Sequence, residues 1–127
     1  MTAKLISLML VIAGIIHVLP LAGVVGSERL AALYGLDFSD PNLAILMRHR
    51  AVLFGLLGVF LIYAAFRPSQ QPVAFVAGFI SAAAFLGLAW ATGGYNSLLA
   101  KVVAADVVAL VCLVIGAVAY LAARAGP

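Results

Sequence analysis

The sequence predicts an all-α membrane protein, an up-down four-helix bundle with a short interfacial helix between its first two spans. Hydrophobic residues make up 67% of the 127 residues and the mean hydropathy is +1.27, whereas soluble globular domains are about 45–50% apolar. Four segments are apolar for about 20 residues or more, the length that crosses the hydrocarbon of a bilayer. The expected spans, in a single domain, cover residues 5–25, 42–66, 73–92 and 96–123.

The first apolar segment is predicted to stay in the mature protein as a transmembrane helix. A single lysine, Lys4, precedes an apolar run over residues 5–26. This run is longer than the roughly 7–15 apolar residues of a signal peptide, and no small-residue cleavage site ends it. Pro20 is expected to kink the helix, because proline cannot donate the helical hydrogen bond to Ile16.

The stretch SERLAALYG, residues 27–35, predicts a short helix between the first two spans. Ser27 is expected to cap this helix and Gly35 to close it, because these residue types favour the two ends of helices. The side chains expected at the membrane surface are Leu30, Leu33 and Tyr34. A lid over the bundle is the alternative role for this helix.

Turn-forming residues separate the later spans. Asp40 before Pro41 is a helix start, with an N-cap candidate and a proline where the missing N–H costs nothing. An Arg-Pro pair at residues 67–68 and a Gly-Gly pair at residues 93–94 end the second and third spans. The short loops make these neighbouring helices antiparallel.

Charge and cysteine content set the expected orientation and exclude several classes of protein. Lys4, Arg67 and Arg124 flank the face that carries both termini, with no acid beside them. When charges inside the predicted helices are left out of the count, the positive-inside rule places both termini in the cytoplasm. Counting Lys101, Arg48 and Arg50 reverses this bias. The net charge is +3 with no polybasic patch, so no nucleic-acid partner is expected. Cys112 is the only cysteine, which excludes an intramolecular disulfide and a two-cysteine redox centre.

The run LMRHRAVLFG, residues 46–55, places charge at the start of a long apolar helix. At a rise of about 1.5 Å per residue, His17 and His49 both lie roughly 12 Å inward from the same membrane face. Ionisable groups inside a membrane are costly and are functional candidates by default. No metal site is predicted, and the candidate ligand-binding residues in this half of the bilayer are Arg48, Arg50, Asp106, Lys101, Tyr95, Asn96 and Trp90.

Helical periodicity predicts where the two arginines point. Arg48 is expected to face the bundle, because small residues mark the packed side of a transmembrane helix. The small residues on its stripe are Ala51, Gly55 and Gly58. Arg50 lies about 200° away around the helix, so it is expected to snorkel to the surface or to contact another helix.

A buried ion pair is the next prediction for these residues. A lone aspartate in a span costs about 2.5 to 3.5 kcal/mol at the helix centre, and Asp106 lies ten residues into the last expected span. Pairing with Arg48 would neutralise both charges. His17 and His49 would then be the groups able to exchange protons near neutral pH, so they are the candidate catalytic residues.

Two stretches resemble small bacterial four-helix membrane proteins of the DoxX-like group, namely LYGLDFSDPNLAILMRHRAVLFGLLGVFLIYAAFRP and WATGGYN. The resemblance covers nearly the whole chain and is most specific at RHRAVLFG. It implies a location in the bacterial inner membrane and a link to quinone or thiol redox chemistry. Some relatives carry the name phosphopantetheine adenylyltransferase. That soluble enzyme uses an HxGH motif, whereas His17 is followed here by Val-Leu-Pro, so this activity is not expected.

Two functions of different class fit these residues. The first is a protein that binds or acts on a lipophilic small molecule with a polar head, such as a quinone, an isoprenoid or a lipid. The head would meet Arg48, His49, His17 and Asp106. The second is a non-enzymatic accessory or structural membrane subunit, in which an Arg48–Asp106 latch fixes two helices. The sequence does not decide between enzyme and non-enzyme, and it predicts no particular cofactor.

Two further functions have weaker support. His17 and His49 at matched depth would suit a bis-histidine haem, but two histidines are a weak signal. A small multidrug exporter would need a glutamate in its first span, and its cationic substrates would be repelled by Arg48 and Arg50. Membrane lipids are the expected partners. Small-residue faces on every span leave a homo-oligomer or a membrane-protein partner open.

Overall fold

The computed structural model describes residues 1–126 and confirms the all-α prediction for them. The helices, in chain order, are α1 (Thr2–Val18), the 3₁₀ segment η1 (Leu19–Val25), α2 (Ser27–Tyr34), α3 (Pro41–Ala65), the 3₁₀ turn η2 (Pro68–Gln70), α4 (Gln71–Thr92) and α5 (Ser97–Ala125). Four stretches are long and apolar enough to cross a membrane, Thr2–Val25, Pro41–Ala65, Pro68–Thr92 and Ser97–Ala125. They overlap the four expected spans and support an integral membrane protein.

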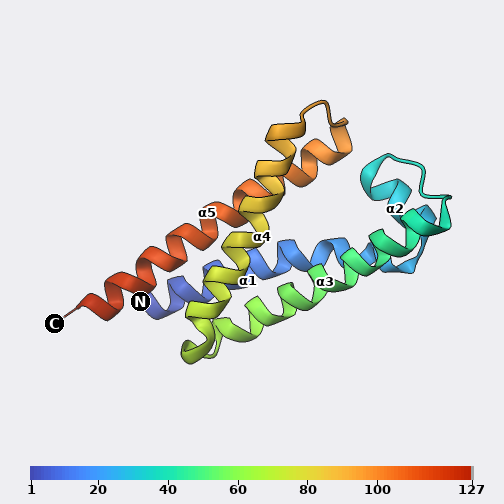
Figure 1. The fold of residues 1–127 in the computed structure, drawn as a ribbon. Helices are drawn as coiled ribbons and strands as arrows, with labels where there is room; N and C mark the ends of the chain where they lie inside the picture. Colours follow the sequence, from blue (N-terminus) through green and yellow to red (C-terminus); the bar gives the residue numbers. More distant parts are fainter. Residues whose placement is uncertain (127) are drawn as a thin grey trace.

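The four long helices form an up-down bundle with both termini at one end (Figure 1). Helix α1 packs against α3 and α5, and α4 packs mainly on α5 and more lightly on α3. Helices α3 and α5 are therefore diagonal to each other. We call the half with the two termini and η2 the terminal half. The half with α2 and the turn at residues 93–96 is the loop half.

Glycines bring α1 and α3 into backbone contact. A Cβ atom built on Gly58 would lie 2.5 Å from the Val18 Cγ2 atom and 2.6 Å from the Gly14 carbonyl oxygen. A Cβ atom on Gly14 would in turn lie 2.8 Å from the Gly58 carbonyl oxygen. Small residues allow such close approach where no hydrophobic driving force acts between helices in lipid. The two helices are fixed against each other at this crossing.

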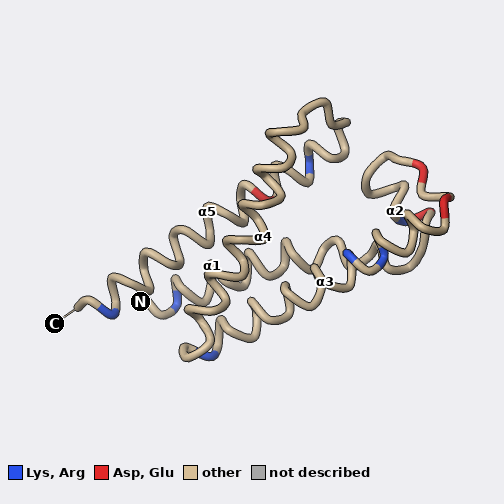
Figure 2. The backbone as a smooth tube through the Cα atoms, viewed as in Figure 1, with Lys and Arg blue, Asp and Glu red and all other residues tan. Residues whose placement is uncertain are grey.

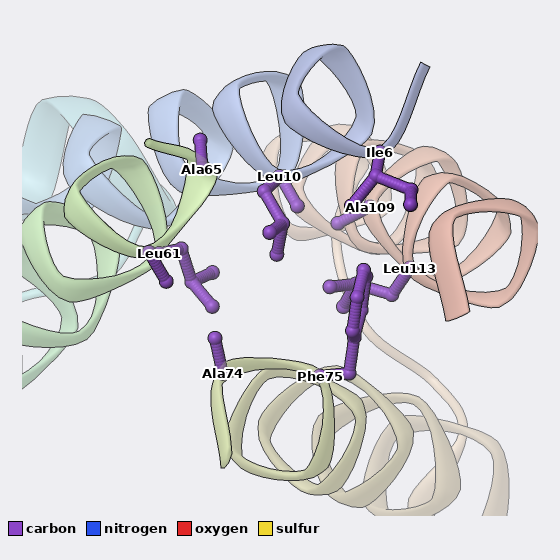
Figure 3. Packing of buried hydrophobic residues seen from close by; sticks show 10 residues of the cluster. Ile6, Leu10, Leu61, Ala65, Ala74, Phe75, Ala109 and Leu113 are labelled. Atoms are coloured by element: carbon purple, nitrogen blue, oxygen red, sulfur yellow. The ribbon is translucent and has the colours of Figure 1, made fainter. Parts of the chain in front are cut away.

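An apolar core fills the terminal half between the four helices (Figure 3). Gly78 and Gly116 make room for its large members: a Cβ on Gly116 would lie 2.8 Å from the Phe75 ring, and one on Gly78 would lie 3.1 Å from Leu113. The buried core residues are Ile6, Leu10, Ala13, Leu61, Ala64, Ala65, Ala74, Phe75, Ala109 and Leu113. This half is held by close packing of apolar side chains.

The first span changes helix type beside its proline. The chain passes from α1 into the 3₁₀ segment η1 at Leu19, directly before Pro20. Pro20 has no N–H to donate to the Ile16 carbonyl, so the α-helical bonding cannot continue through this position. The expected disturbance at this position takes the form of a 3₁₀ segment. It ends at Gly26, where the chain turns into α2.

Helix α2 folds back over the loop half. Leu30 and Tyr34 are buried, 1% and 4% exposed, and form a small apolar cluster with Phe38. The prediction that these two α2 side chains lie on the membrane surface is wrong, because they face the bundle instead. Ser27 is also not the cap: it is the first helical residue, and Gly26 takes the cap position without a side-chain bond.

The other predicted helix ends are confirmed. Gly35 closes α2 in the left-handed conformation, with φ 68° and ψ 28°, and donates its N–H to the Ala31 carbonyl. Asp40 caps α3 by accepting a hydrogen bond from the Asn42 N–H at 2.9 Å. Gly93 follows the last residue of α4. Local turn chemistry therefore determines where these helices begin and end.

Candidate functional site

Acidic residues lie only in the loop half, which also holds most of the polar groups inside the spans (Figure 2). Three of the four acids, Glu28, Asp37 and Asp40, are exposed on α2 and the loop that follows it. The fourth, Asp106, is on α5 and is only 6% exposed. The candidate site is therefore built around Asp106 and the groups that face it.

His17 is the most deeply buried polar side chain of this region, with 1% of its surface exposed. Its Nδ1 lies 2.8 Å from the Ala13 carbonyl oxygen and its Nε2 lies 3.2 Å from the Ser81 Oγ. A carbonyl only accepts, so Nδ1 carries the hydrogen of its bond to Ala13, and Nε2 shares a hydrogen bond with the Ser81 hydroxyl. The ring also stacks on Phe54, with centroids 5.8 Å apart. His17 thus links α1 to α3 and α4.

The Arg50 guanidinium lies among three aromatic rings in the loop half. Its guanidinium carbon lies 4.3 Å from the centroid of Phe54 and 5.8 Å from those of Tyr34 and Phe85. Its Nη1 donates a hydrogen bond to the Tyr34 hydroxyl at 3.1 Å. Of the two positions predicted for Arg50, contact with other helices is the one found. Cation–π attraction is worth about 2 kcal/mol where the cation is desolvated.

Arg48 does not point to Asp106, so the predicted ion pair is wrong. The Arg48 side chain is exposed, and its Nε donates to the Val24 carbonyl oxygen at 2.8 Å. Its small-residue stripe does pack inward, but against α1 and η1: a Cβ on Gly55 would lie 2.7 Å from Leu21. Arg48 lies on the same stripe two turns nearer the start of α3, and there it meets the end of η1. The latch between helices α3 and α5 that this pair would have made is absent from the described residues.

Asp106 makes no ion pair within residues 1–126. The ionisable groups near enough to act electrostatically on its carboxyl group are His17 and Arg50. It is buried on α5, which packs against α1 beside His17. Asp106, His17 and Arg50 together with Ser81 and Tyr34 form what we call the polar cluster. Only one of the two predicted histidines and one of the two predicted arginines belong to it.

Two grooves flank the polar cluster. The larger, about 400 Å³, lies between α2, α3 and α4; we call it the Arg50 groove, because Arg50 is the only charged residue among its lining. Its other lining residues are Tyr34, Leu36, Phe38, Leu43, Met47, Phe85, Leu88, Ala89, Thr92, Gly93, Tyr95 and Leu99. The second, about 320 Å³, is lined by both Lys101 and Asp106; we call it the Asp106 groove. Tyr34 lines both grooves and separates them.

The remaining predicted residues divide into those at the grooves and those away from them. Tyr95 lines the Arg50 groove and Lys101 the Asp106 groove. Asn96 caps α5 by accepting from the Leu99 N–H at 2.8 Å, and its Nδ2 donates to the Tyr34 carbonyl at 2.8 Å. His49 is exposed and Trp90 is 87% exposed, and neither lines a groove.

Four residues of the site were not predicted from the sequence: Tyr34, Phe54, Ser81 and Phe85. Phe54 follows Arg50 by four residues and so shares its face of α3, which is a usable signal. Ser81 is the only polar residue between Gln71 and Thr92 on α4, and an isolated polar residue in a span marks an interhelical hydrogen bond. Tyr34 and Phe85 carry no local signal, since they reach Arg50 through the packing of α2 and α4.

The site offers no metal centre within residues 1–126, where no three His, Cys, Asp or Glu side chains gather. Cys112 is buried on α5 as a free thiol. No protein-family model, no curated protein and no solved structure matches this chain. The function must therefore be argued from the polar cluster and its grooves.

Proposed function

We propose that this chain is an integral protein of the bacterial inner membrane that binds a lipophilic small molecule with a polar head in the Arg50 groove. The proposal rests on a groove of about 400 Å³ in which Arg50 is the only charged lining residue and most of the others are apolar. This volume is within the roughly 300–1,000 Å³ of small-molecule sites, which are mostly apolar with a few placed polar groups. A quinone, an isoprenoid or a lipid has this combination of tail and head.

Arg50 is the group proposed to hold the head. A guanidinium has five N–H donors and no acceptor, and one of its nitrogens donates to the Tyr34 hydroxyl. The rings of Phe54, Tyr34 and Phe85 fix its plane. The remaining donors suit carbonyl or anionic oxygens of a ligand head.

A binding role has more support than catalysis by histidine. His17 is 1% exposed, both ring nitrogens have partners, and it lines neither groove. A general acid or base has to come within hydrogen-bonding reach of its substrate. His17 therefore supports the site by positioning Phe54 beneath Arg50. We assign no proton transfer to it.

The membrane location and orientation belong to the same proposal. Lys4, Arg67 and Arg124 lie at the terminal end with no acid in that half (Figure 2), which favours cytoplasmic termini by the positive-inside rule. The Arg50 groove would then lie in the non-cytoplasmic half of the bilayer. The resemblance of RHRAVLFG to DoxX-like proteins is consistent with this placement.

Native mass spectrometry of gently purified protein tests the proposal. Arg50→Gln should lose a small molecule that the wild type retains. Arg48→Gln is the matched control, because it removes the same charge two residues away, outside the groove, and should retain the molecule. If all three folded proteins carry only phospholipid in equal amounts, the ligand proposal fails. The chain would then be an accessory or structural subunit whose polar cluster joins its helices.

A further inference from the structure

A separate cavity opens at the opposite end of the molecule, in the terminal half. Its volume is about 450 Å³, and it is bounded by the start of α1, the end of α3, the start of α4 and the end of α5. Its lining includes Ile6, Ser7, Phe66, Gln71, Tyr120 and Arg124. These lie at the ends of the candidate spans, so the cavity is level with the lipid headgroups.

Two polar side chains that line this cavity are uncharged and already bonded to the protein. The Ser7 hydroxyl donates to the Ala65 carbonyl at 2.6 Å, and the Gln71 amide donates to the same oxygen at 3.5 Å. That carbonyl belongs to the last residue of α3, where the helix itself supplies no donor. Apart from Tyr120 and Arg124 the remaining lining is apolar, with Ile6 buried and Phe66 exposed. The inner part therefore suits a hydrocarbon chain.

The rim of the cavity is positively charged. The guanidinium carbon of Arg124 lies 5.8 Å from the centroid of the Tyr120 ring, and Nη1 donates to the Tyr120 hydroxyl at 3.1 Å. The other N–H donors of the guanidinium remain for a ligand. Arg124 is the one charged residue among the lining residues. No acid lies in this half, since all four are in the loop half (Figure 2).

We infer that this cavity binds an anionic membrane phospholipid, with its phosphate on Arg124 and an acyl chain along Ile6 and Phe66. Basic pockets between transmembrane helices are a recognised way to hold anionic lipid headgroups, and each nearby cation contributes about 1 kcal/mol near a membrane surface, or roughly fivefold in affinity. Arginine forms paired hydrogen bonds with phosphate oxygens. The inference does not depend on the ligand proposed for the Arg50 groove or on which side the termini occupy.

Lipid competition tests the inference. The detergent-purified chain is mixed with phosphatidylglycerol and phosphatidylcholine of identical acyl chains, and bound lipid is counted by native mass spectrometry. The wild type should prefer phosphatidylglycerol by about fivefold. Arg124→Gln should lose this preference, and Arg124→Lys, which keeps the charge, should retain most of it. Arg67→Gln should keep it, because Arg67 stacks on Tyr63 and does not line the cavity.

Three outcomes would overturn the inference. Equal binding of the two lipids by the wild type would show that the cavity does not select anions. Equal loss of preference in Arg124→Gln and Arg67→Gln would show a diffuse surface charge rather than a site. Complete displacement of the lipid by millimolar glycerol phosphate, without the acyl chains, would show a site for a free phosphate compound instead.

Discussion

The two halves of this bundle use opposite means to hold the same helices together. In the terminal half, apolar side chains from all four long helices interlock around Leu10, Leu61 and Leu113. In the loop half, the central positions are taken by His17, Arg50 and Asp106, with aromatic rings around them. The loop half retains grooves because polar and aromatic groups replace the interlocking core.

The neighbour relations of α4 explain why the larger groove forms where it does. Helix α4 packs mainly on α5 and more lightly on α3, and the Arg50 groove lies between α3, α4 and α2. The pair α1 and α3, by contrast, is in backbone contact at Gly14 and Gly58. Close contact on one side of α3 and light contact on the other leave space beside Arg50.

The largest effect is expected from filling the contact between α1 and α3. Gly58→Ala places a methyl group 2.6 Å from the Gly14 carbonyl oxygen and 2.8 Å from the Val18 backbone nitrogen. Because both are backbone atoms, they cannot move without separating the helices. We expect the free energy of unfolding to fall by about 3 kcal/mol, measured by circular dichroism during titration with sodium dodecyl sulfate.

Gly87→Ala is the control for that substitution. Gly87 lies on α4, and a Cβ atom there meets nothing within 4 Å. Alanine should leave stability unchanged or raise it by up to about 1 kcal/mol, through its higher helix propensity. Equal destabilisation by both substitutions would refute the view that the α1–α3 crossing is the rigid contact of the bundle.

The next effect concerns the stacked arginine. Arg50→Ala removes the guanidinium from the rings of Phe54, Tyr34 and Phe85 and leaves Asp106 without that cation. A loss of about 1 to 2 kcal/mol in unfolding free energy is expected from cation–π attraction, because Arg50 is half-buried among these rings. Arg48→Ala removes a surface hydrogen bond to Val24 and should cost only about 0.5 kcal/mol. The reverse order would mean that Arg48 is the inward arginine after all.

Substitutions at Asn96 test the hydrogen bond that joins the start of α5 to the end of α2. Asn96→Ala removes the cap of α5 and the donor to the Tyr34 carbonyl, and should cost about 1 to 2 kcal/mol. Asn96→Asp keeps an oxygen that can cap Leu99 but has no donor for Tyr34. If thermal unfolding shows Asn96→Asp to be as stable as the wild type, the bond to α2 contributes nothing.

The smallest effect is expected between His17 and Ser81. Their hydrogen bond of 3.2 Å joins α1 to α4, and a neutral side-chain bond contributes about 1 kcal/mol. A double-mutant cycle of His17→Phe and Ser81→Ala should give a coupling energy of about this size. A coupling energy of zero would show that α4 is positioned beside the cluster by α5 alone.

The sequence was sufficient to predict the four spans and most helix ends. Span length follows from the apolar runs, and ends such as Asp40 and Gly35 follow from residue chemistry that acts within a few positions. The level of the polar residues along the bundle was also predictable from the helical rise, which places His17 and Asp106 in the same half.

The partners of the polar residues were not predictable in the same way. Periodicity showed that Arg48 shares a stripe with small residues, but not which helix packs on that stripe. The prediction of an Arg48–Asp106 pair required α3 and α5 to be neighbours, whereas they are diagonal with α1 and α4 between them. The order of helices around a bundle depends on packing of whole faces, and one chain's residue spacing does not encode it locally.

The 3₁₀ segment η1 affects where the bundle meets the bilayer surface. A 3₁₀ helix rises about 2.0 Å per residue against about 1.5 Å for an α-helix, so η1 extends the first span by several ångströms without added residues. Thr2–Val25 then reaches about 40 Å, against a hydrocarbon thickness of about 30 Å. If the basic residues of the terminal end mark one membrane surface, as proposed above, then η1, α2 and the outer part of the Arg50 groove would lie among the opposite headgroups. A ligand of that groove would thus exchange sideways through the headgroup layer, without crossing the midplane of the membrane.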